Sequence, residues 1–273
     1  MACPSRRGEP LSNQLGVAKH RYYAWAHMPI YDEFIDRPLS RWGRASSQWS
    51  NTSILKNFLR ITKSDPKKVD LLEIGCGRGY IGLASKSLGF QSFTGIEPNH
   101  RLAQYCRELL DATIHEELLP HLKSLADNSF DLVMSAHVLE HAMNPMEARE
   151  WCEEMNRLVR PGGHVLIVCP DVIDYKNYFW DTDWSHGYPP TPKRVSQIYD
   201  DIGLEVAYSG KMHLGHTGLG FAFLAHVISG LFPTHLGDAL TARVFGRPLV
   251  SGLKITLWGL VFAVGRKPGE SAF

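Results

Sequence analysis

The sequence has no long apolar run, no paired cysteine motif and almost no net charge, and each absence excludes a class of protein. No apolar run reaches the roughly 18 residues that a membrane-spanning helix needs, so we expect no such helix. The five cysteines are scattered without a C-x-x-C pair, which argues against a disulfide scaffold and fits reduced thiols. A net charge of +1 leaves no basic footprint for nucleic acid.

Internal repeats and low-complexity tracts are also missing. The 273 residues suit one large domain, or one domain with a cap. Residues 1–16 are polar and lack the apolar stretch of a secretory signal. We therefore expect a cytoplasmic globular protein.

The segment 206–269 combines apolar runs with charged residues that are nearly all positive. It contains six Lys or Arg residues and a single acid, Asp238. Such a tail suits contact with an anionic membrane surface or a lipid-linked substrate. A buried helix and strand with solvated charges explains the same pattern and is the simpler interpretation, so peripheral membrane contact stays an alternative.

From residue 69 onward, apolar strand-like runs alternate with helical segments. The pattern predicts strands at 69–74, 92–96, 112–115, 130–135, 164–169, 204–209 and 256–265. It predicts helices at 80–88, 99–110, 145–160, 192–202, 219–232 and 237–245. Strands separated by helices of this length indicate an α/β fold with a doubly wound, mostly parallel sheet.

Two regions are expected to lie outside that alternation. Residues 1–66 should form an N-terminal helical cap of short helices, because Arg37-Pro38 and Trp42-Gly43 interrupt any long helix. The domain proper is then 67–273, with a partly apolar helical insertion at about 210–250.

One turn joins an apolar run to three closely spaced glycines. Residues 71–80 read Leu-Leu-Glu-Ile-Gly-Cys-Gly-Arg-Gly-Tyr, and Glu97 ends the next apolar run. Glycines let the backbone approach a ligand closely, and an acid at that distance accepts hydrogen bonds from a ribose diol. The turn fits two registers, Gly77-x-Gly79-x-x-Gly82 of dinucleotide binders and Glu73-x-Gly75-x-Gly77-x-Gly79.

The second register resembles motif I of class I S-adenosylmethionine-dependent methyltransferases, of the small-molecule or glycan type similar to methyltransferase domain 11. Residues 128–141, 160–164 and 261–268 look like the fourth-strand, fifth-strand and closing-strand regions of that family, in its order. The resemblance implies a Rossmann-like sheet of seven strands whose last strand is antiparallel. It also implies S-adenosyl-L-methionine as the cofactor and methyl transfer as the activity.

The resemblance also assigns cofactor contacts. Backbone groups of the turn are expected beside the methionine part, Glu73 near the amino group and Glu97 on the ribose hydroxyls. Glu116 or Glu117 is expected at the adenine amine, where many relatives have Asp. The predicted set is Glu73, Gly75, Cys76, Gly77, Gly79, Glu97, Pro98, Glu116, Ser135, Ala136 and His137.

Two histidines are candidate catalytic bases. A hydroxyl acceptor must lose its proton, and a histidine that titrates near neutrality suits that step. His141 lies just past the fourth predicted strand, and His186 lies in a later loop with Asp183. A positional or structural role explains either histidine as well. His213 and His216 lack a third ligand at a recognised spacing, so we predict no metal site.

The loop at 171–188 is the candidate acceptor site because it gathers six aromatic residues and four acids. Such groups suit sugar rings or a cation, although an aromatic cluster that anchors a long loop explains the pattern equally. The predicted contacts are Tyr175, Tyr178, Trp180, Asp183, Trp184 and Tyr188. Residues 180–195 also resemble a segment of methyltransferases from bacterial cell-surface glycan or secondary-metabolite pathways.

The sequence therefore predicts O-methylation of a small molecule or a saccharide, lipid-linked saccharides included, with N- or C-methylation less favoured. Two alternatives stay open. The first is an NAD(P)-dependent oxidoreductase that uses the Gly77–Gly82 register. The second is a non-catalytic scaffold that only binds the cofactor.

Overall fold

The computed structural model describes residues 41–213, 215–217, 243 and 258–269. Its helices are α3 (Arg41–Thr62), α4 (Tyr80–Leu88), α5 (His100–Leu110), α6 (Pro145–Leu158), α7 (Val172–Tyr175), α8 (Tyr178–Thr182) and α9 (Pro192–Asp201), with short 3-10 turns η1 (Pro66–Lys68) and η2 (Leu139–His141). Its strands are β1 (Asp70–Ile74), β2 (Ser92–Ile96), β3 (Thr113–His115), β4 (Phe130–Ala136), β5 (Val159–Pro170), β6 (Glu205–His213), β7 (His216–Thr217) and β8 (Leu260–Arg266).

The strands form one sheet in the order β3-β2-β1-β4-β5-β8-β6-β7. Strands β1 to β5 pair in parallel, whereas β8 lies antiparallel between β5 and β6. The predicted mostly parallel sheet and its antiparallel last strand are confirmed. The predicted count of seven strands is one too low, because the two-residue β7 folds back onto the end of β6. A strand that short has no periodicity to read.

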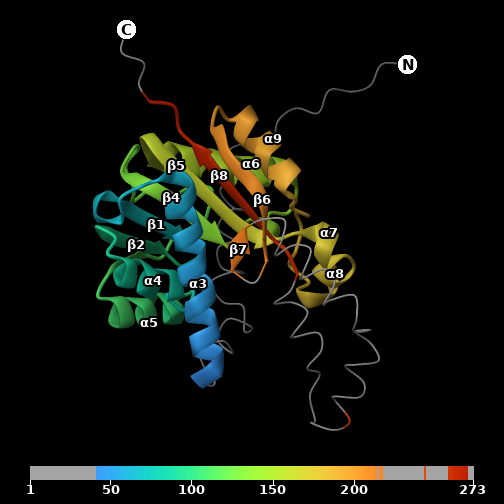
Figure 1. Ribbon diagram of the computed structural model, residues 1–273, viewed down its shortest axis with the longest axis horizontal. Helices are drawn as coiled ribbons and strands as arrows, with labels where there is room; N and C mark the ends of the chain where they lie inside the picture. Colours follow the sequence, from blue (N-terminus) through green and yellow to red (C-terminus); the bar gives the residue numbers. More distant parts are fainter. Residues whose placement is uncertain (1–40, 214, 218–242, 244–257, 270–273) are drawn as a thin grey trace, which may run out of the picture.

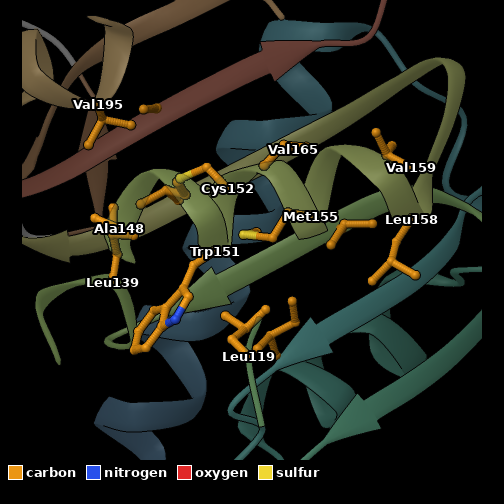
Figure 2. Packing of buried hydrophobic residues seen from close by; sticks show 14 of the residues in the cluster. Leu119, Leu139, Ala148, Trp151, Cys152, Met155, Leu158, Val159, Val165 and Val195 are labelled. Atoms are coloured by element: carbon orange, nitrogen blue, oxygen red, sulfur yellow. The ribbon is translucent and has the colours of Figure 1, made fainter. Parts of the chain in front are cut away.

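Helices cover both faces of the sheet (Figure 1). Successive strand residues point to opposite faces, so Leu71 packs under α3 and α4 while Leu72 packs under α6 and α9. Figure 2 shows the second of these layers, where α6 buries Trp151, Met155 and neighbouring side chains against the sheet. Each fully buried apolar side chain stabilises the fold by roughly 1.5–3 kcal/mol.

Local capping signals fix several helix ends as the sequence predicts. Asn99 accepts a hydrogen bond from the Leu102 N–H at 3.0 Å and begins α5. Asn144 caps α6 and Thr191 caps α9 in the same manner. Gly89 ends α4 with a positive φ of 76°, the left-handed conformation that favours glycine at this position.

Several boundary predictions are wrong. The strand predicted at 204–209 continues to His213, and the strand predicted at 256–265 begins at Leu260. Where a local signal misled the prediction, tertiary contacts outweigh it. One 22-residue helix, α3, runs through Trp42-Gly43. A glycine costs about 1 kcal/mol in a helix, and burial of Leu55 and Phe58 in the core exceeds that cost. Helix α6 ends at Leu158, two residues early, because Val159 already pairs with β4.

The predicted strand at 164–169 likewise begins earlier, at Val159 in β5. The backbone of Gly162 and Gly163 pairs with Lys267, beyond the end of β8. The presumed loop at 171–188 contains the two short helices α7 and α8. The predicted helices at 219–232 and 237–245, most of the predicted insertion and most of the cap lie outside the described residues. Among the residues that are described, no helix is both long and apolar enough to cross a bilayer.

His164 of β5 makes stability depend on pH. Its ring packs edge-on against Phe58 at 5.6 Å between centroids, and burial lowers the pKa of its imidazole to about 4. In the unfolded chain that pKa lies near 6.5, so on acidification the unfolded state takes up the proton first. Burial of the neutral His164 ring is therefore compatible with full stability above about pH 6.5, and the free energy of unfolding decreases as the pH falls from there towards 4.

We expect His164→Leu to flatten this acid-dependent loss of unfolding free energy. Urea denaturation of both chains at pH 7 and pH 4.5 measures it, with exposed His121→Leu as the control. Identical pH dependence in wild type and His164→Leu would remove His164 as the cause.

Candidate functional site

The glycine turn after β1 has a backbone conformation that favours glycine at three positions. Gly75, Gly77 and Gly79 have positive φ values of 75°, 49° and 72°. The N–H of Gly75 donates to the Ile96 carbonyl at 2.8 Å, so the turn is tied to the end of β2. A Cβ at Gly75 would lie 2.5 Å from Val138, whereas a Cβ at Gly77 would meet nothing within 4 Å. Gly77 therefore borders open space.

Glu97 faces this turn from the end of β2. Its Oε2 accepts from the Gly77 N–H at 2.9 Å, and its Oε1 accepts from the Asn99 N–H at 3.0 Å. A carboxylate offers about four acceptor positions, so one remains on each oxygen for a vicinal diol. Burial raises the pKa of the Glu97 carboxyl, and the two backbone hydrogen bonds offset part of that rise.

Glu73, two residues before the first glycine, is also buried. Only 3% of its surface is exposed, and its Oε2 has no hydrogen-bond partner in the structure. Burial, with a smaller contribution from nearby Cys106 and Glu97, raises the pKa of the Glu73 carboxyl well above its usual range. An unpaired buried oxygen is costly, so this position is suited to a polar ligand group.

The carboxyl ends of three strands meet beside the turn. Ile74 pairs with Ile96 on one side and with Ser135 on the other. Ser135 is buried, Ala136 is half-buried, and His137 has a positive φ of 58°. Ligands of open α/β sheets bind at this edge. The open turn, the diol acceptor and the unpaired Glu73 oxygen together fit an adenosine-containing cofactor with an amino group, with Pro98 half-buried beside Glu97.

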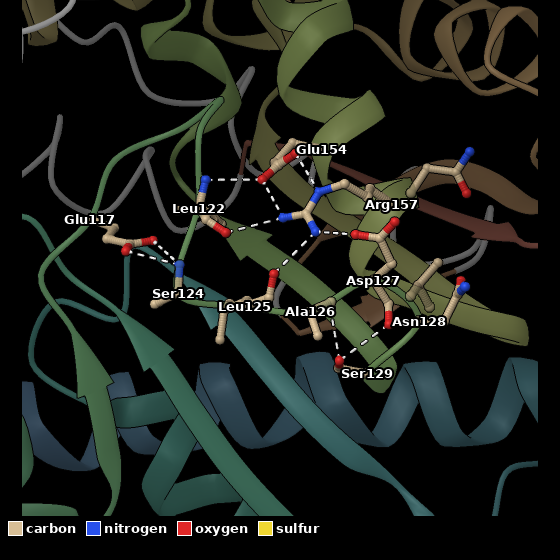
Figure 3. A network of polar contacts seen from close by, with 12 residues as sticks. Glu117, Leu122, Ser124, Leu125, Ala126, Asp127, Asn128, Ser129, Glu154 and Arg157 are labelled. Atoms are coloured by element: carbon tan, nitrogen blue, oxygen red, sulfur yellow. Dashed lines mark hydrogen bonds and ion pairs between the residues drawn. The ribbon is translucent and has the colours of Figure 1, made fainter.

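The segment after β3 lies at the predicted adenine end. Glu116 bonds to Arg107 at 2.8 Å and to His100 at 3.0 Å. Burial alone would raise the pKa of Glu116, but these hydrogen bonds outweigh it and the pKa lies below its usual range. Glu117 accepts from the Ser124 backbone instead, and Arg157 of α6 anchors the same segment (Figure 3). The adenine contact of Glu116 stays a prediction.

The structure brings both candidate catalytic histidines together. The ring centroids of His141 and His186 lie 5.1 Å apart. The backbone N–H groups of Gly187 and Tyr188 donate to the Glu140 carbonyl at 2.9 and 3.1 Å, which ties the later loop to η2. Burial lowers the pKa of the His141 imidazole, the charge of Glu140 opposing that effect.

A hydrogen-bonded relay orients His141. The Ser185 hydroxyl donates to Asp183 Oδ1 at 2.5 Å, and His141 Nδ1 lies 2.9 Å from the same hydroxyl oxygen. Because the hydroxyl proton is directed at the carboxylate, the imidazole Nδ1 is the donor to Ser185. The neutral ring then has its lone pair on Nε2. Burial raises the pKa of Asp183, but the bonds from Ser185 outweigh it and the pKa is lowered.

Sequence reasoning grouped Asp183 with His186, whereas the structure links Asp183 to His141 through Ser185. Ser185 was missed, since a serine beside an acid in a loop has no distinguishing local pattern. His186 is oriented separately, with Nδ1 2.6 Å from the Phe179 carbonyl oxygen.

The predicted aromatic acceptor residues differ in exposure: two are exposed, and the other three are buried or half-buried. Trp180 and Trp184 are 49% and 78% exposed, so their rings are available to a ligand. Tyr175 and Tyr178 each lie 5.0 Å from the Trp258 ring, at the start of the last strand segment. Tyr188 is 1% exposed and belongs to the core under α6 and α9. The loop thus has an aromatic outer surface and a buried anchor.

An ion-pair cluster not foreseen from the sequence fixes the base of this loop. Lys211 of β6 binds both Asp171 and Asp174, the latter at 2.7 Å. Asp174 also accepts from the Gly259 N–H at 3.0 Å. Lys211 and Gly259 lie 37 and 85 positions from Asp174, so no local spacing could reveal the cluster. They hold α7 against the start of β8.

Replacement of Glu97 tests its assignment. We expect Glu97→Ala to weaken S-adenosylhomocysteine binding by about 1–3 kcal/mol, since ribose hydroxyls lose a charged acceptor. Calorimetric titration measures this, and exposed Glu108→Ala on α5 is the control. Equal affinity in the Glu97→Ala and Glu108→Ala chains would refute the role.

Comparison with known proteins finds a family that part of this chain resembles. Residues 72–167 match the family model described as a methyltransferase domain. An uncharacterized methyltransferase of Schizosaccharomyces pombe is 30% identical over 125 residues, covering 39% of this chain and 42% of the relative. The mitochondrial ubiquinone biosynthesis O-methyltransferase of Dictyostelium discoideum is 26% identical over 113 residues, covering 36% and 34%. The chain thus spans less than half the length of these curated relatives.

Solved structures share the fold. A SAM-dependent methyltransferase from Archaeoglobus fulgidus superposes with a TM-score of 0.52 at 19% identity, covering 79% of this chain and 94% of that one. The N-methyltransferase NodS from Bradyrhizobium japonicum, in complex with S-adenosylhomocysteine, gives 0.51 at 15% identity, covering 80% and 85%. The usual dinucleotide-binding strand order, 3-2-1-4-5-6, lacks the antiparallel β8 found between β5 and β6. The solved structures thus confirm the fold. The match over residues 72–167 confirms the predicted resemblance to methyltransferases, for which S-adenosylmethionine is the expected cofactor.

Proposed function

We propose that this chain, whose residues 72–167 form an S-adenosylmethionine-dependent methyltransferase domain, methylates a hydroxyl group of a small molecule or a saccharide. The observation that carries the proposal is the oriented His141, placed just beyond β4. Val138, three residues earlier, lies against Gly75 of the cofactor turn. A proton acceptor and a methyl donor therefore share one edge of the sheet.

The residues of the chain divide the work between binding and proton transfer. Glu97 holds the ribose diol, and the backbone around Gly77 borders the methionine part. The bound cofactor supplies an electrophilic methyl group. Hydroxyls are weak nucleophiles until deprotonated, so the lone pair of His141, or of neighbouring His186, takes the acceptor proton. The relay from Asp183 through Ser185 keeps His141 in the tautomer that can do this.

The acceptor class follows from the aromatic outer surface of the loop. Exposed Trp180 and Trp184 offer flat apolar faces, which suit the apolar face of a sugar or another ring. The resemblance of residues 180–195 to methyltransferases of glycan and secondary-metabolite pathways supports the same class. The named relatives include an O-methyltransferase and an N-methyltransferase, so fold alone does not choose the acceptor atom.

Methyl-group labelling tests the proposal. Methyl-labelled S-adenosylmethionine is incubated with the full chain and panels of hydroxylated sugars, phenols and amines. We expect label in the hydroxylated acceptors, lost when the hydroxyl is replaced by hydrogen. Label only in amines would contradict O-methylation, and tight cofactor binding with no transfer across the panels would favour the scaffold alternative.

The substitution Ser185→Ala tests whether the orientation of His141 matters for turnover independently of cofactor binding. It removes the hydroxyl that bridges Asp183 and His141 without removing either group. Loss of such a supporting partner typically costs about 10–100-fold in activity, so we expect kcat to fall by that factor. The affinity for S-adenosylhomocysteine should not change. A steady-state kcat equal to wild type would show that the relay is dispensable.

A further inference from the structure

Three potential metal ligands converge where η2 meets the loop before α9. One ligand atom each from Glu140, His141 and His186 lies within 4.8 Å of the others, and this is the group of three found among the described residues. The two histidines come from segments that the backbone bonds to Glu140 already hold together. The cluster is therefore part of the fixed framework of the site.

The hydrogen bonds of both imidazoles place the ring proton on the same nitrogen, Nδ1. His186 Nδ1 lies 2.6 Å from a carbonyl oxygen, which can only accept, so Nδ1 holds the proton. His141 Nδ1 is likewise the donor to Ser185. Each neutral ring then presents its Nε2 lone pair. Metal-binding histidines characteristically donate their other N–H to a carbonyl or to a carboxylate-linked group.

Glu140 supplies a second, independent observation. It is 1% exposed, and its Oε2 has no hydrogen-bond partner in the structure. His137 reaches only the other oxygen, at 3.5 Å between Nδ1 and Oε1. A buried carboxylate oxygen without a partner is destabilising, and a cation at this point would remove that cost.

We propose that Glu140, His141 and His186 bind a divalent transition-metal ion of the zinc class. Two imidazoles and one carboxylate suit Zn²⁺, whereas Mg²⁺ prefers oxygen ligands alone. Metal–ligand bonds of about 2.0–2.2 Å place the ligand atoms of a tetrahedral site roughly 3.4 Å apart. The ligand atoms here lie within 4.8 Å of one another, so a small movement of the side chains would bring them to that spacing. Three protein ligands leave a fourth position open, as in catalytic zinc sites.

The open position connects the ion to the acceptor, and this connection rests on the proposed function. A bound ion lowers the pKa of an oxygen that it coordinates. In the loaded chain the two imidazoles act as ligands, and an acceptor hydroxyl on the ion would release its proton to solvent. In the ion-free chain His141 takes that proton itself. Binding of the ion does not depend on either step.

Cobalt titration tests the site directly. Full-length chain without a histidine tag is treated with chelator and titrated with Co²⁺, a coloured probe for zinc sites. We expect a visible absorption band that saturates at one ion per chain and disappears when Zn²⁺ is added. Glu140→Gln and His186→Ala should each weaken Co²⁺ binding by about tenfold or more. Exposed His121→Ala is the matched control and should bind as wild type.

S-adenosylhomocysteine titration of the same samples separates this inference from the proposed function. Absence of a saturable cobalt band in chain that still binds S-adenosylhomocysteine overturns the metal site and leaves methyl transfer standing. A band unaffected by Glu140→Gln also overturns it, since this near-isosteric change keeps the fold while removing the charge. Stoichiometric Co²⁺ binding without methyl transfer to any acceptor supports the metal site and contradicts the proposed function.

Discussion

His141→Ala is expected to lower kcat by about 10²- to 10⁴-fold, the usual contribution of a positioned proton acceptor. His141 is the histidine that the Asp183–Ser185 relay orients, and it lies beyond β4 at the edge shared with the glycine turn. The cofactor contacts are assigned to other residues, so the affinity for S-adenosylhomocysteine should stay within about twofold of wild type. Single-turnover rates with the labelled cofactor measure the first effect, and calorimetry measures the second.

His121→Ala is the control for this comparison, because His121 is exposed and distant in sequence from the relay. Near-wild-type rates in both the His141→Ala and His186→Ala chains would contradict proton removal by this pair. Catalysis would then consist of aligning the two substrates. A chelator that abolishes wild-type turnover would favour the metal-bound form of the site over the free imidazole.

Gly77→Ala is expected to weaken S-adenosylhomocysteine binding about 5- to 150-fold, or about 1–3 kcal/mol, the cost of forcing a methyl group into occupied space. In the protein alone the added Cβ meets nothing within 4 Å, so the substitution causes no steric clash, and its only cost to the fold is backbone strain. If the turn binds the cofactor as assigned, the bound cofactor would fill that space.

Gly89→Ala is an unusually close control for Gly77→Ala. Gly89 also has a positive φ, 76°, and its Cβ would also meet nothing within 4 Å. Both substitutions put alanine in the left-handed region, at about 1–2 kcal/mol, but Gly89 ends α4 away from the turn. Equal binding by the two variants would contradict a cofactor beside Gly77, and equal unfolding free energies would confirm that the strain is matched.

Much of the fold could be predicted because its signals are local. The alternation of strands and helices placed β2 and α4 at the residues where the structure has them. Asn99 as a cap and Gly89 as a terminator act within one helical turn. The glycine turn and Glu97 could also be predicted, because each ends a strand and the two strands are consecutive in the chain. In the structure these strands are neighbours in the sheet, and a hydrogen bond joins Gly77 to Glu97.

The rest depends on contacts that no local pattern records. Helix α3 continues through Gly43 because its apolar residues are buried against a sheet whose strands follow it in the sequence. The bond between His141 and Ser185 joins residues 44 positions apart. The prediction of no metal site considered only His213 and His216. Glu140 and His186 are 46 positions apart in the sequence and come close together only in the folded chain.

The central claim is that the turn at Gly75–Gly79, together with Glu97, binds the sulfonium cofactor and not a dinucleotide. Calorimetric titration of the wild-type chain with S-adenosylhomocysteine and, separately, with NAD⁺ tests it most directly. We predict saturable binding of S-adenosylhomocysteine at one molecule per chain and no heat of binding for NAD⁺. Saturable binding of NAD⁺ with none of S-adenosylhomocysteine would contradict the account.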